Sequence, residues 1–125
     1  IDKLSKKVKE VLDIENLKFT QKFDNIFVIA LIEHIYNQRH FISEIIKYLK
    51  KDGRIIITTP TPFGNDIIHL IGSKIGLFSK AAADDHVVIY NKKRFEILAK
   101  DFNLKIIKYK KFQFGCNQLV ILQKK

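Results

Sequence analysis

FDNIFVIALIEHI at residues 23–35 and KKDGRIIITTP at residues 50–60 bracket the stretch of sequence that decides the fold. Each segment contains an apolar run rich in β-branched residues, at 25–31 and at 54–59. Continuous apolar runs of this length are typical of strands that are covered on both faces of a parallel sheet. The two runs therefore predict two neighbouring buried strands.

A helix is predicted between the two strands. Apolar residues recur at helical spacing from Phe41 to Leu49, while charged residues occupy the other side. Lys50 and Lys51 suit the negative C-terminal end of the helix dipole, and Gly53 supplies the turn into the second strand. A strand, a helix and a parallel strand in this order cross over right-handed, so the stretch predicts an α/β fold.

The segment from 61 to 90 has a different character. Residues 61–65 form a cluster of turn-forming residues, and 66–72 predict a short apolar helix. A segment of this kind between a strand and the next element often forms a lid or a substrate wall. Its apolar residues stand beside lysines, so contact with a membrane surface is the alternative interpretation.

The last third of the chain predicts a helix and a hairpin. The helix begins after Asn91, its N-cap, and extends to Phe102, with Asn103 in the left-handed conformation that closes it. An antiparallel hairpin with Gly115 at its bend completes the chain. Its two strands are predicted at 104–112 and 116–123.

Composition indicates one small globular domain that spans residues 1–125. The chain is 46% hydrophobic and 29% charged, with a formal net charge of +10. It has no signal-peptide pattern and no apolar run near the roughly 20 residues of a membrane span. The single cysteine, Cys116, excludes an internal disulfide and fits a reducing cytoplasm. No Cys or His pair has metal-ligand spacing, so no metal site is predicted.

The basic residues are mostly lysine and are spread along the chain. Their densest run is Lys105, Lys108, Lys110 and Lys111, where they alternate with apolar residues. This alternation predicts the solvent face of a strand. Contact of that face with nucleic acid is the alternative, because attraction to phosphate requires only charge.

Four segments together resemble the second half of a class I methyltransferase that depends on S-adenosylmethionine. They are FD at 23–24, EH at 33–34, LKKDG at 49–53 and TP at 59–60. The family usually has PGG where this chain has KDG, a difference that affects turn stiffness more than chemistry. The resemblance implies a Rossmann-like sheet with strand order 3-2-1-4-5-7-6, the last strand antiparallel, and S-adenosylmethionine as cofactor.

Two acidic residues near the start match cofactor-binding positions of that family. Asp2, with Lys3 beside it, lies where the family has the acid that binds both ribose hydroxyls. Asp13 and Ile14 lie where the adenine amino group and ring are held. Local explanations compete with both assignments, since Asp2 could cap a helix and Asp13 could belong to an ordinary turn.

The end of the first predicted buried strand carries the candidate catalytic residue. Ligands of open α/β sheets bind outside the carboxyl ends of strands, where Glu33 and His34 stand. The resemblance places the backbone of Ala30 and Leu31 against the cofactor, and Glu33 and His34 beside the substrate. His34 is the candidate general base for a hydroxyl acceptor. The alternative role for His34 is a hydrogen bond to backbone at the start of the helix.

Two further residues are assigned to the substrate side, Phe63 in the lid segment and His86 near its end. With Ile67 and Phe78 of the same segment, they predict a partly apolar pocket for a small molecule. Sugar, lipid-linked, quinone and small aromatic acceptors all fit this description. The oligomeric state has no signal in the sequence.

The first strand of the resembled fold and its glycine-rich loop have no counterpart in this sequence. No acid is followed by G-x-G-x-G, and the chain contains no methionine, even at position 1. Strands are predicted near residues 1 and 11. In the sheet order of the resembled family, the missing first strand would lie between the strand that ends at Asp2 and the strand that ends at Ala30. We therefore expect a further N-terminal segment in the natural polypeptide.

Three functional interpretations follow. The first is a methyltransferase that acts on a small molecule or on a glycan or lipid-linked acceptor. The second is a non-catalytic domain of the same fold that binds a partner. The third is a different doubly wound protein, such as a nucleotide-binding reductase or a basic nucleic-acid binder, because one α/β architecture carries many chemistries.

Overall fold

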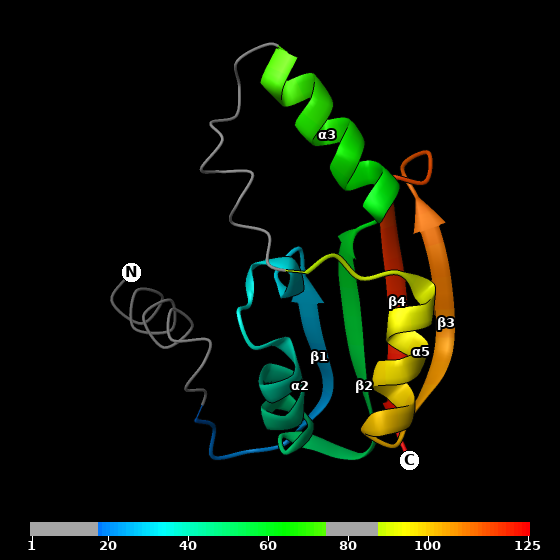
Figure 1. Ribbon diagram of the computed structural model, residues 1–125. Helices are drawn as coiled ribbons and strands as arrows, with labels where there is room; N and C mark the ends of the chain where they lie inside the picture. The colour runs from blue at the N-terminus through cyan, green and yellow to red at the C-terminus, as the bar shows by residue number, and fades with distance from the viewer. Residues whose placement is uncertain (1–17, 75–87) are drawn as a thin grey trace, which may run out of the picture.

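The computed structural model describes residues 18–74 and 88–125, and its first two strands pair in parallel (Figure 1). β1 spans Phe23–Ile29 and β2 spans Leu49–Pro60, with Ile29 opposite Thr58. The 3-10 helix η2 (Ile32–His34) and the helix α2 (Gln38–Ile46) connect them. The predicted strand, helix and parallel strand are therefore confirmed.

The C-terminal part adds two helices and a hairpin. α3 spans Pro62–Lys74 and α5 spans Lys92–Asp101. β3 (Leu104–Phe112) and β4 (Asn117–Lys124) are antiparallel, as predicted, and β4 also pairs antiparallel with β2. The four strands form one mixed sheet in the order β1-β2-β4-β3, so the strand made last lies inside the sheet. The strands predicted near residues 1 and 11 lie outside the described residues.

The hydrophobic core lies between the sheet and the two helices α2 and α5, which cover the same face (Figure 1). Alternate residues of β2 point into this core, and Ile55 and Ile57 have no exposed surface. The apolar stripes of the helices meet them, as the helical spacing predicts. The stripes contribute Phe41, Ile42, Ile45, Phe95, Leu98 and Ala99.

The start of β2 differs from the prediction. α2 ends at Ile46, so Lys50 and Lys51 belong to β2 rather than to the end of the helix. The left-handed residue is Asp52, with φ of 60°. Gly53 is required for a different reason, because an added Cβ would lie 2.7 Å from the carbonyl oxygen of Lys50. The helix dipole was therefore the wrong explanation for the two lysines.

The turn predicted at residues 61–65 is the first turn of α3. The Thr61 hydroxyl oxygen accepts a hydrogen bond of 2.9 Å from the Gly64 amide and donates one of 2.7 Å to the Gly115 carbonyl. Thr61 is thus a helix N-cap, and Pro62 occupies the first helical position, where a missing amide hydrogen has no cost. Gly64 lies directly against the carbonyl of Cys116, which fixes the start of α3 on the hairpin bend.

The predicted ends of α5 are confirmed. The Asn91 side chain accepts a hydrogen bond of 2.8 Å from the Arg94 amide, and Asn103 is left-handed with φ of 53°. At the hairpin bend, Gln113 and Phe114 are left-handed together with Gly115. The sequence pointed only to the glycine, because non-glycine residues seldom adopt this conformation.

Replacement of Gly64 should destabilise the fold more than replacement of Gly115. A Cβ at Gly64 would lie 1.9 Å from the Cys116 carbonyl oxygen, whereas a Cβ at Gly115 has open space around it. We expect Gly64→Ala to lower the free energy of unfolding by about 3 kcal/mol. Gly115→Ala should lower it by about 1 kcal/mol, since only its φ of 82° is unfavourable. Urea unfolding measures both, and equal losses would contradict the backbone contact.

Candidate functional site at the carboxyl edge of the sheet

Ala30 makes a sharp turn where β1 ends. It is left-handed, with φ of 47°, and its amide donates a hydrogen bond of 2.9 Å to the Thr58 carbonyl of β2. Left-handed non-glycine residues are uncommon, and they concentrate at functional sites. The predicted cofactor-binding residues Ala30 and Leu31 therefore lie at a backbone turn on the carboxyl edge of the two parallel strands, with Ala30 exposed and Leu31 half-buried against the core.

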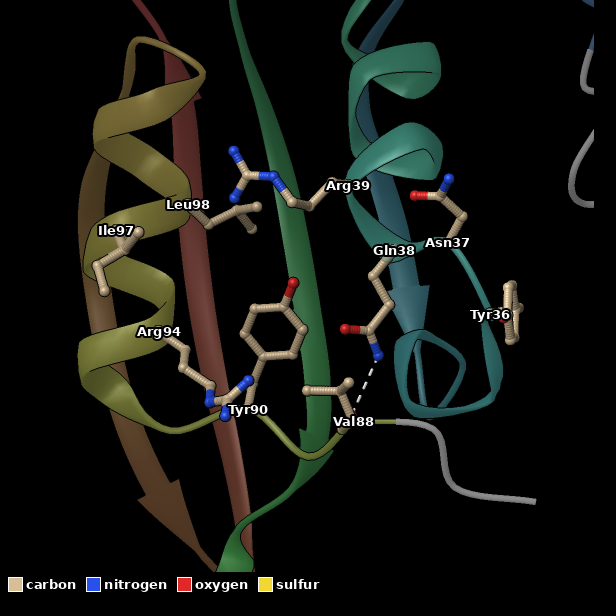
Figure 2. Close-up of a pocket in the computed structure, with 9 residues that line it drawn as sticks. All are labelled: Tyr36, Asn37, Gln38, Arg39, Val88, Tyr90, Arg94, Ile97 and Leu98. Atoms are coloured by element: carbon tan, nitrogen blue, oxygen red, sulfur yellow. Dashed lines mark hydrogen bonds between the residues drawn. The ribbon is translucent and has the colours of Figure 1, made fainter. Parts of the chain in front are cut away.

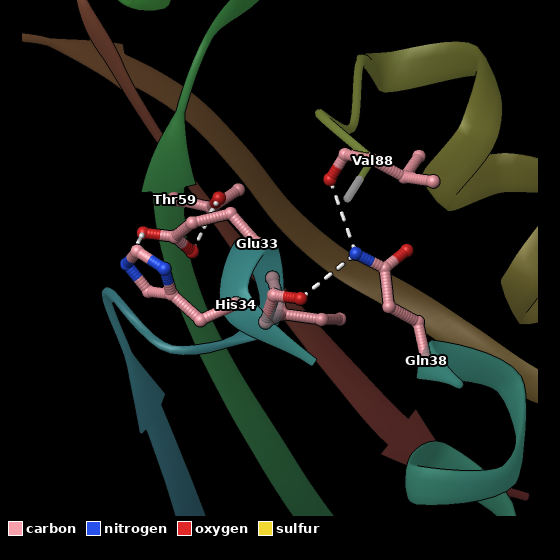
Figure 3. Close-up of polar contacts among 6 residues, drawn as sticks. Glu33, His34, Gln38, Thr59 and Val88 are labelled. Atoms are coloured by element: carbon pink, nitrogen blue, oxygen red, sulfur yellow. Dashed lines mark hydrogen bonds and ion pairs between the residues drawn. The ribbon is translucent and has the colours of Figure 1, made fainter. Parts of the chain in front are cut away.

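Glu33 and His34 lie next to each other in η2, but in different environments (Figure 3). The Glu33 carboxylate is buried and accepts a hydrogen bond of 2.9 Å from the Thr59 hydroxyl at the end of β2. The His34 imidazole is half exposed, and its Nε2 lies 3.9 Å from Glu33 Oε1. The sequence predicts that Glu33 borders the substrate. In the structure its carboxylate is buried, and the His34 imidazole is the exposed member of the pair.

Gln38 joins three segments at the same edge (Figure 3). Its side-chain amide donates hydrogen bonds of 2.8 Å to the Ile32 carbonyl and 3.0 Å to the Val88 carbonyl. It therefore fixes η2, the start of α2 and the segment that leads into α5 relative to one another. Sequence reasoning missed Gln38, because its partners are set by the fold and it stands outside the apolar stripe.

A groove of about 580 Å³ separates α2 from α5 (Figure 2). Two tyrosines stand at it, Tyr36 almost fully exposed and Tyr90 buried. Arg39 is held by an ion pair of 2.9 Å with Asp101. The groove thus has aromatic and cationic walls. Its other lining residues are Asn37, Gln38, Val88, Arg94, Ile97 and Leu98.

The Tyr90 phenol is a neutral group at physiological pH. Burial raises the pKa of Tyr90, and the nearby guanidinium groups of Arg39 and Arg94 lower it by a smaller amount. A neutral phenol can donate a hydrogen bond and presents an apolar ring. The groove therefore offers a mixed surface suited to a partly aromatic or partly polar small molecule.

Gln118 is the second polar residue that sequence reasoning missed. Its side chain is fully buried, and its amide nitrogen donates to the Pro60 carbonyl at 3.1 Å and to the Tyr90 carbonyl at 2.5 Å. Its amide oxygen accepts from the Tyr109 hydroxyl at 2.8 Å. One side chain thus connects β2, β3, β4 and the segment before α5. No sequence pattern marks it, because it occupies an ordinary position in a strand.

The remaining predicted site residues are distributed as follows. Phe63 is exposed on the first turn of α3 and lines a second cavity, between the starts of α3 and α5. The other predicted cofactor and substrate residues, namely Asp2, Lys3, Asp13, Ile14 and His86, lie outside the described residues. Within residues 18–74 and 88–125, no group of three His, Cys, Asp or Glu side chains is placed to hold a metal ion. None of the helices in these ranges is long and apolar enough to cross a membrane.

Residues 3–112 match the protein family described as "Methyltransferase domain". The chain belongs to this family. The match covers most of the chain and includes η2, β3 and the two helices beside the groove, α2 and α5. No curated protein matches the chain significantly.

Solved structures share the fold of this methyltransferase domain at low sequence identity. Magnesium protoporphyrin IX methyltransferase from Synechocystis PCC 6803, with bound SAH, has a TM-score of 0.63 and 17% identity over 97% of this chain and 57% of its own. A Bacillus halodurans protein described as a methyltransferase has a TM-score of 0.66 and 14% identity, over 90% of this chain and 69% of its own.

A third solved structure is the N-methyltransferase NodS from Bradyrhizobium japonicum WM9 in complex with S-adenosyl-L-homocysteine. Its TM-score is 0.59 and its identity 13%, over 90% of this chain and 51% of its own. The chain therefore spans between 51% and 69% of the length of these three structures. Their common feature with this domain is the fold.

Loss of the Gln118 side chain should destabilise the domain strongly. Gln118→Ala leaves two carbonyls and the Tyr109 hydroxyl without their buried partner, so we expect a loss of about 3 kcal/mol in the free energy of unfolding. The matched control is Gln123→Ala on the same strand, which removes one exposed hydrogen bond to the Asp52 carbonyl. That variant should lose less than about 1 kcal/mol. Similar urea midpoints for the two variants would show that Gln118 does not hold the edge together.

Proposed function

We propose that this domain binds S-adenosylmethionine and transfers its methyl group to a small-molecule, glycan or lipid-linked acceptor. The observation that carries the proposal is the exposed left-handed turn at Ala30, next to the Glu33 and His34 pair, in a domain of the methyltransferase family. Two relatives of the same fold hold S-adenosylhomocysteine, which is the cofactor after loss of its methyl group.

The backbone turn at Ala30 and Leu31 fits one side of the cofactor. Ala30 is exposed, the turn stands at the carboxyl edge of parallel strands, and open α/β sheets bind their ligands there. In this proposal Asp2 and Lys3 hold the ribose, while Asp13 and Ile14 hold the adenine. The full sheet has the order 3-2-1-4-5-7-6, in which β1, β2, β4 and β3 supply the last four positions.

The methyl acceptor enters between α2 and α5 in this proposal. The groove there opens at the carboxyl edge, close to η2, and its tyrosines supply flat apolar surface (Figure 2). Phe63 and His86 belong to the same side of the domain in the sequence-based assignment. Gln38 fixes the two walls relative to each other through its bond to the Val88 carbonyl.

The cofactor supplies a methyl group activated by positively charged sulfur. When bound, the cofactor would give this methyl group to the acceptor oxygen and leave as S-adenosylhomocysteine, which keeps the electron pair of the carbon–sulfur bond. The protein aligns the two groups and removes the hydroxyl proton. His34 accepts that proton, and the buried Glu33 carboxylate stabilises the imidazolium ion that results. Thr59 holds Glu33 in place through its hydrogen bond.

Calorimetric titration of S-adenosylhomocysteine into the natural polypeptide that contains this chain tests the proposal. We expect saturable binding that Asp2→Ala and Asp13→Ala each weaken about tenfold, as loss of a hydrogen bond to bound ligand predicts. Asp24→Ala is the control, because Asp24 is exposed on β1 and its carboxylate pairs with Lys50 at 3.4 Å. Absence of binding to the folded protein would sink the methyltransferase proposal and leave a partner-binding domain.

Replacement of His34 tests the proposed general base. His34→Gln should lower kcat about a hundredfold or more on a hydroxyl acceptor found by screening, because proton removal by a positioned side chain contributes that much. S-adenosylhomocysteine affinity should stay unchanged. His40→Gln, an exposed histidine on α2, is the control and should retain wild-type kcat. Wild-type kcat in His34→Gln would leave the imidazole with a structural role only.

A further inference from the structure

A second cavity, of about 430 Å³, lies between the first turns of α3 and α5 and the end of β3. Three lysines from two different elements line it, Lys92 and Lys93 from α5 and Lys111 from β3. Phe63 provides an exposed apolar wall, and Tyr109 and Gln118 lie among the other lining residues. Among the described residues, no acidic side chain lines the cavity.

Within residues 18–74 and 88–125, no carboxylate forms an ion pair with these lysines. Lys92 instead lies over the ring of Tyr109, with its ammonium 5.7 Å from the ring centre. The cavity is therefore a local concentration of positive charge.

The position of Lys92 and Lys93 is unfavourable for α5 itself. Both stand in the first helical turn, where the positive end of the helix dipole favours acidic residues, and this turn contains none. Cations held at this end repel the dipole and each other. A bound anion would relieve both repulsions, so the local energetics favour an anionic ligand.

The polar floor of the cavity is fixed. The Tyr109 hydroxyl donates to the Gln118 amide oxygen, and the other end of Gln118 is held by two carbonyls. The Tyr109 hydroxyl proton is therefore already used in a hydrogen bond within the protein. The groups left to bind a ligand are the ammonium groups of the three lysines.

The strand register places this cavity at the same edge as the proposed methyl-transfer site. Ile29 is opposite Thr58 on β2, Thr59 is opposite Gln118 on β4, and Gln118 is opposite Lys111 on β3. Neighbouring strands are about 4.8 Å apart, so Lys111 lies about 14 Å along the edge from the end of β1. A small organic molecule can span that distance.

We propose that the cavity lined by Lys92, Lys93 and Lys111 binds the phosphate group of a phosphorylated methyl acceptor. This assignment rests on the proposed methyltransferase function. A phosphate monoester carries a charge of about −1.5 to −2 at neutral pH, whereas a carboxylate carries −1. Three lysine ammonium groups therefore attract a phosphate more strongly than a single carboxylate. The cavity is larger than a phosphate, and Phe63 can pack on the organic part of the acceptor.

Titration with inorganic phosphate, followed by the backbone amide signals in NMR spectra, tests the site. We expect saturable shifts confined to residues 91–94, 109–111 and 118, with a dissociation constant of about 1 mM or tighter. The triple variant K92Q/K93Q/K111Q should weaken binding at least about tenfold. The matched control K105Q/K108Q/K110Q removes three exposed lysines that do not line the cavity and should bind as wild type.

Three outcomes would overturn the site: no saturable shift, equal weakening in both triple variants, or equal binding of acetate at the same ionic strength. The amide spectrum itself shows whether each variant is folded. Phosphate binding is measured without cofactor. Failure of the S-adenosylhomocysteine titration alone would therefore overturn methyl transfer and leave the anion site standing. Normal cofactor binding without phosphate binding would overturn the anion site alone.

Discussion

β2 is hydrogen-bonded on both sides, and this constraint shapes the rest of the molecule. It pairs in parallel with β1 and antiparallel with β4, so its backbone N–H and C=O groups form hydrogen bonds within the protein. Its core-facing side chains are shielded from water. Burial at that depth requires the apolar run Ile55–Ile57, which is also the clearest signal in the sequence. Polar residues are confined to the ends of the strand, and Thr59 and Thr61 at its carboxyl end build the site.

The polar groups at that end support one another. Thr59 holds Glu33, Thr61 caps α3 and bonds the hairpin bend, and Gln118 bonds the Pro60 carbonyl between them. Each of these side chains is buried and hydrogen-bonded, so each has a single well-defined position. A rigid edge of this kind suits methyl transfer, in which alignment of two reacting groups supplies much of the catalysis.

The sequence predicts those parts of the fold that depend on local periodicity. The strand and helix patterns around residues 23–60 and the capped helix after Asn91 needed no tertiary information. Gln38 and Gln118 could not be predicted, because their roles depend on partners brought together by the fold. Gln38 bonds a carbonyl 50 residues later in the chain. The sequence assigns Lys50 and Lys51 to a helix end, because their side chains suit a helix dipole and a strand edge equally well. It predicts a turn at Thr61, because helix caps and turns prefer the same residue types.

The interior position of β4 has a consequence for synthesis of the protein. β4 is made after the other three strands, yet it fills the place between β2 and β3. While β4 is still inside the ribosome, β2 has unpaired backbone groups along one edge, and β3 lacks the strand that it pairs with. Open edges of this kind associate readily with other chains. The four-stranded sheet therefore cannot close until β4 has left the ribosome, and its open edges stay exposed until then.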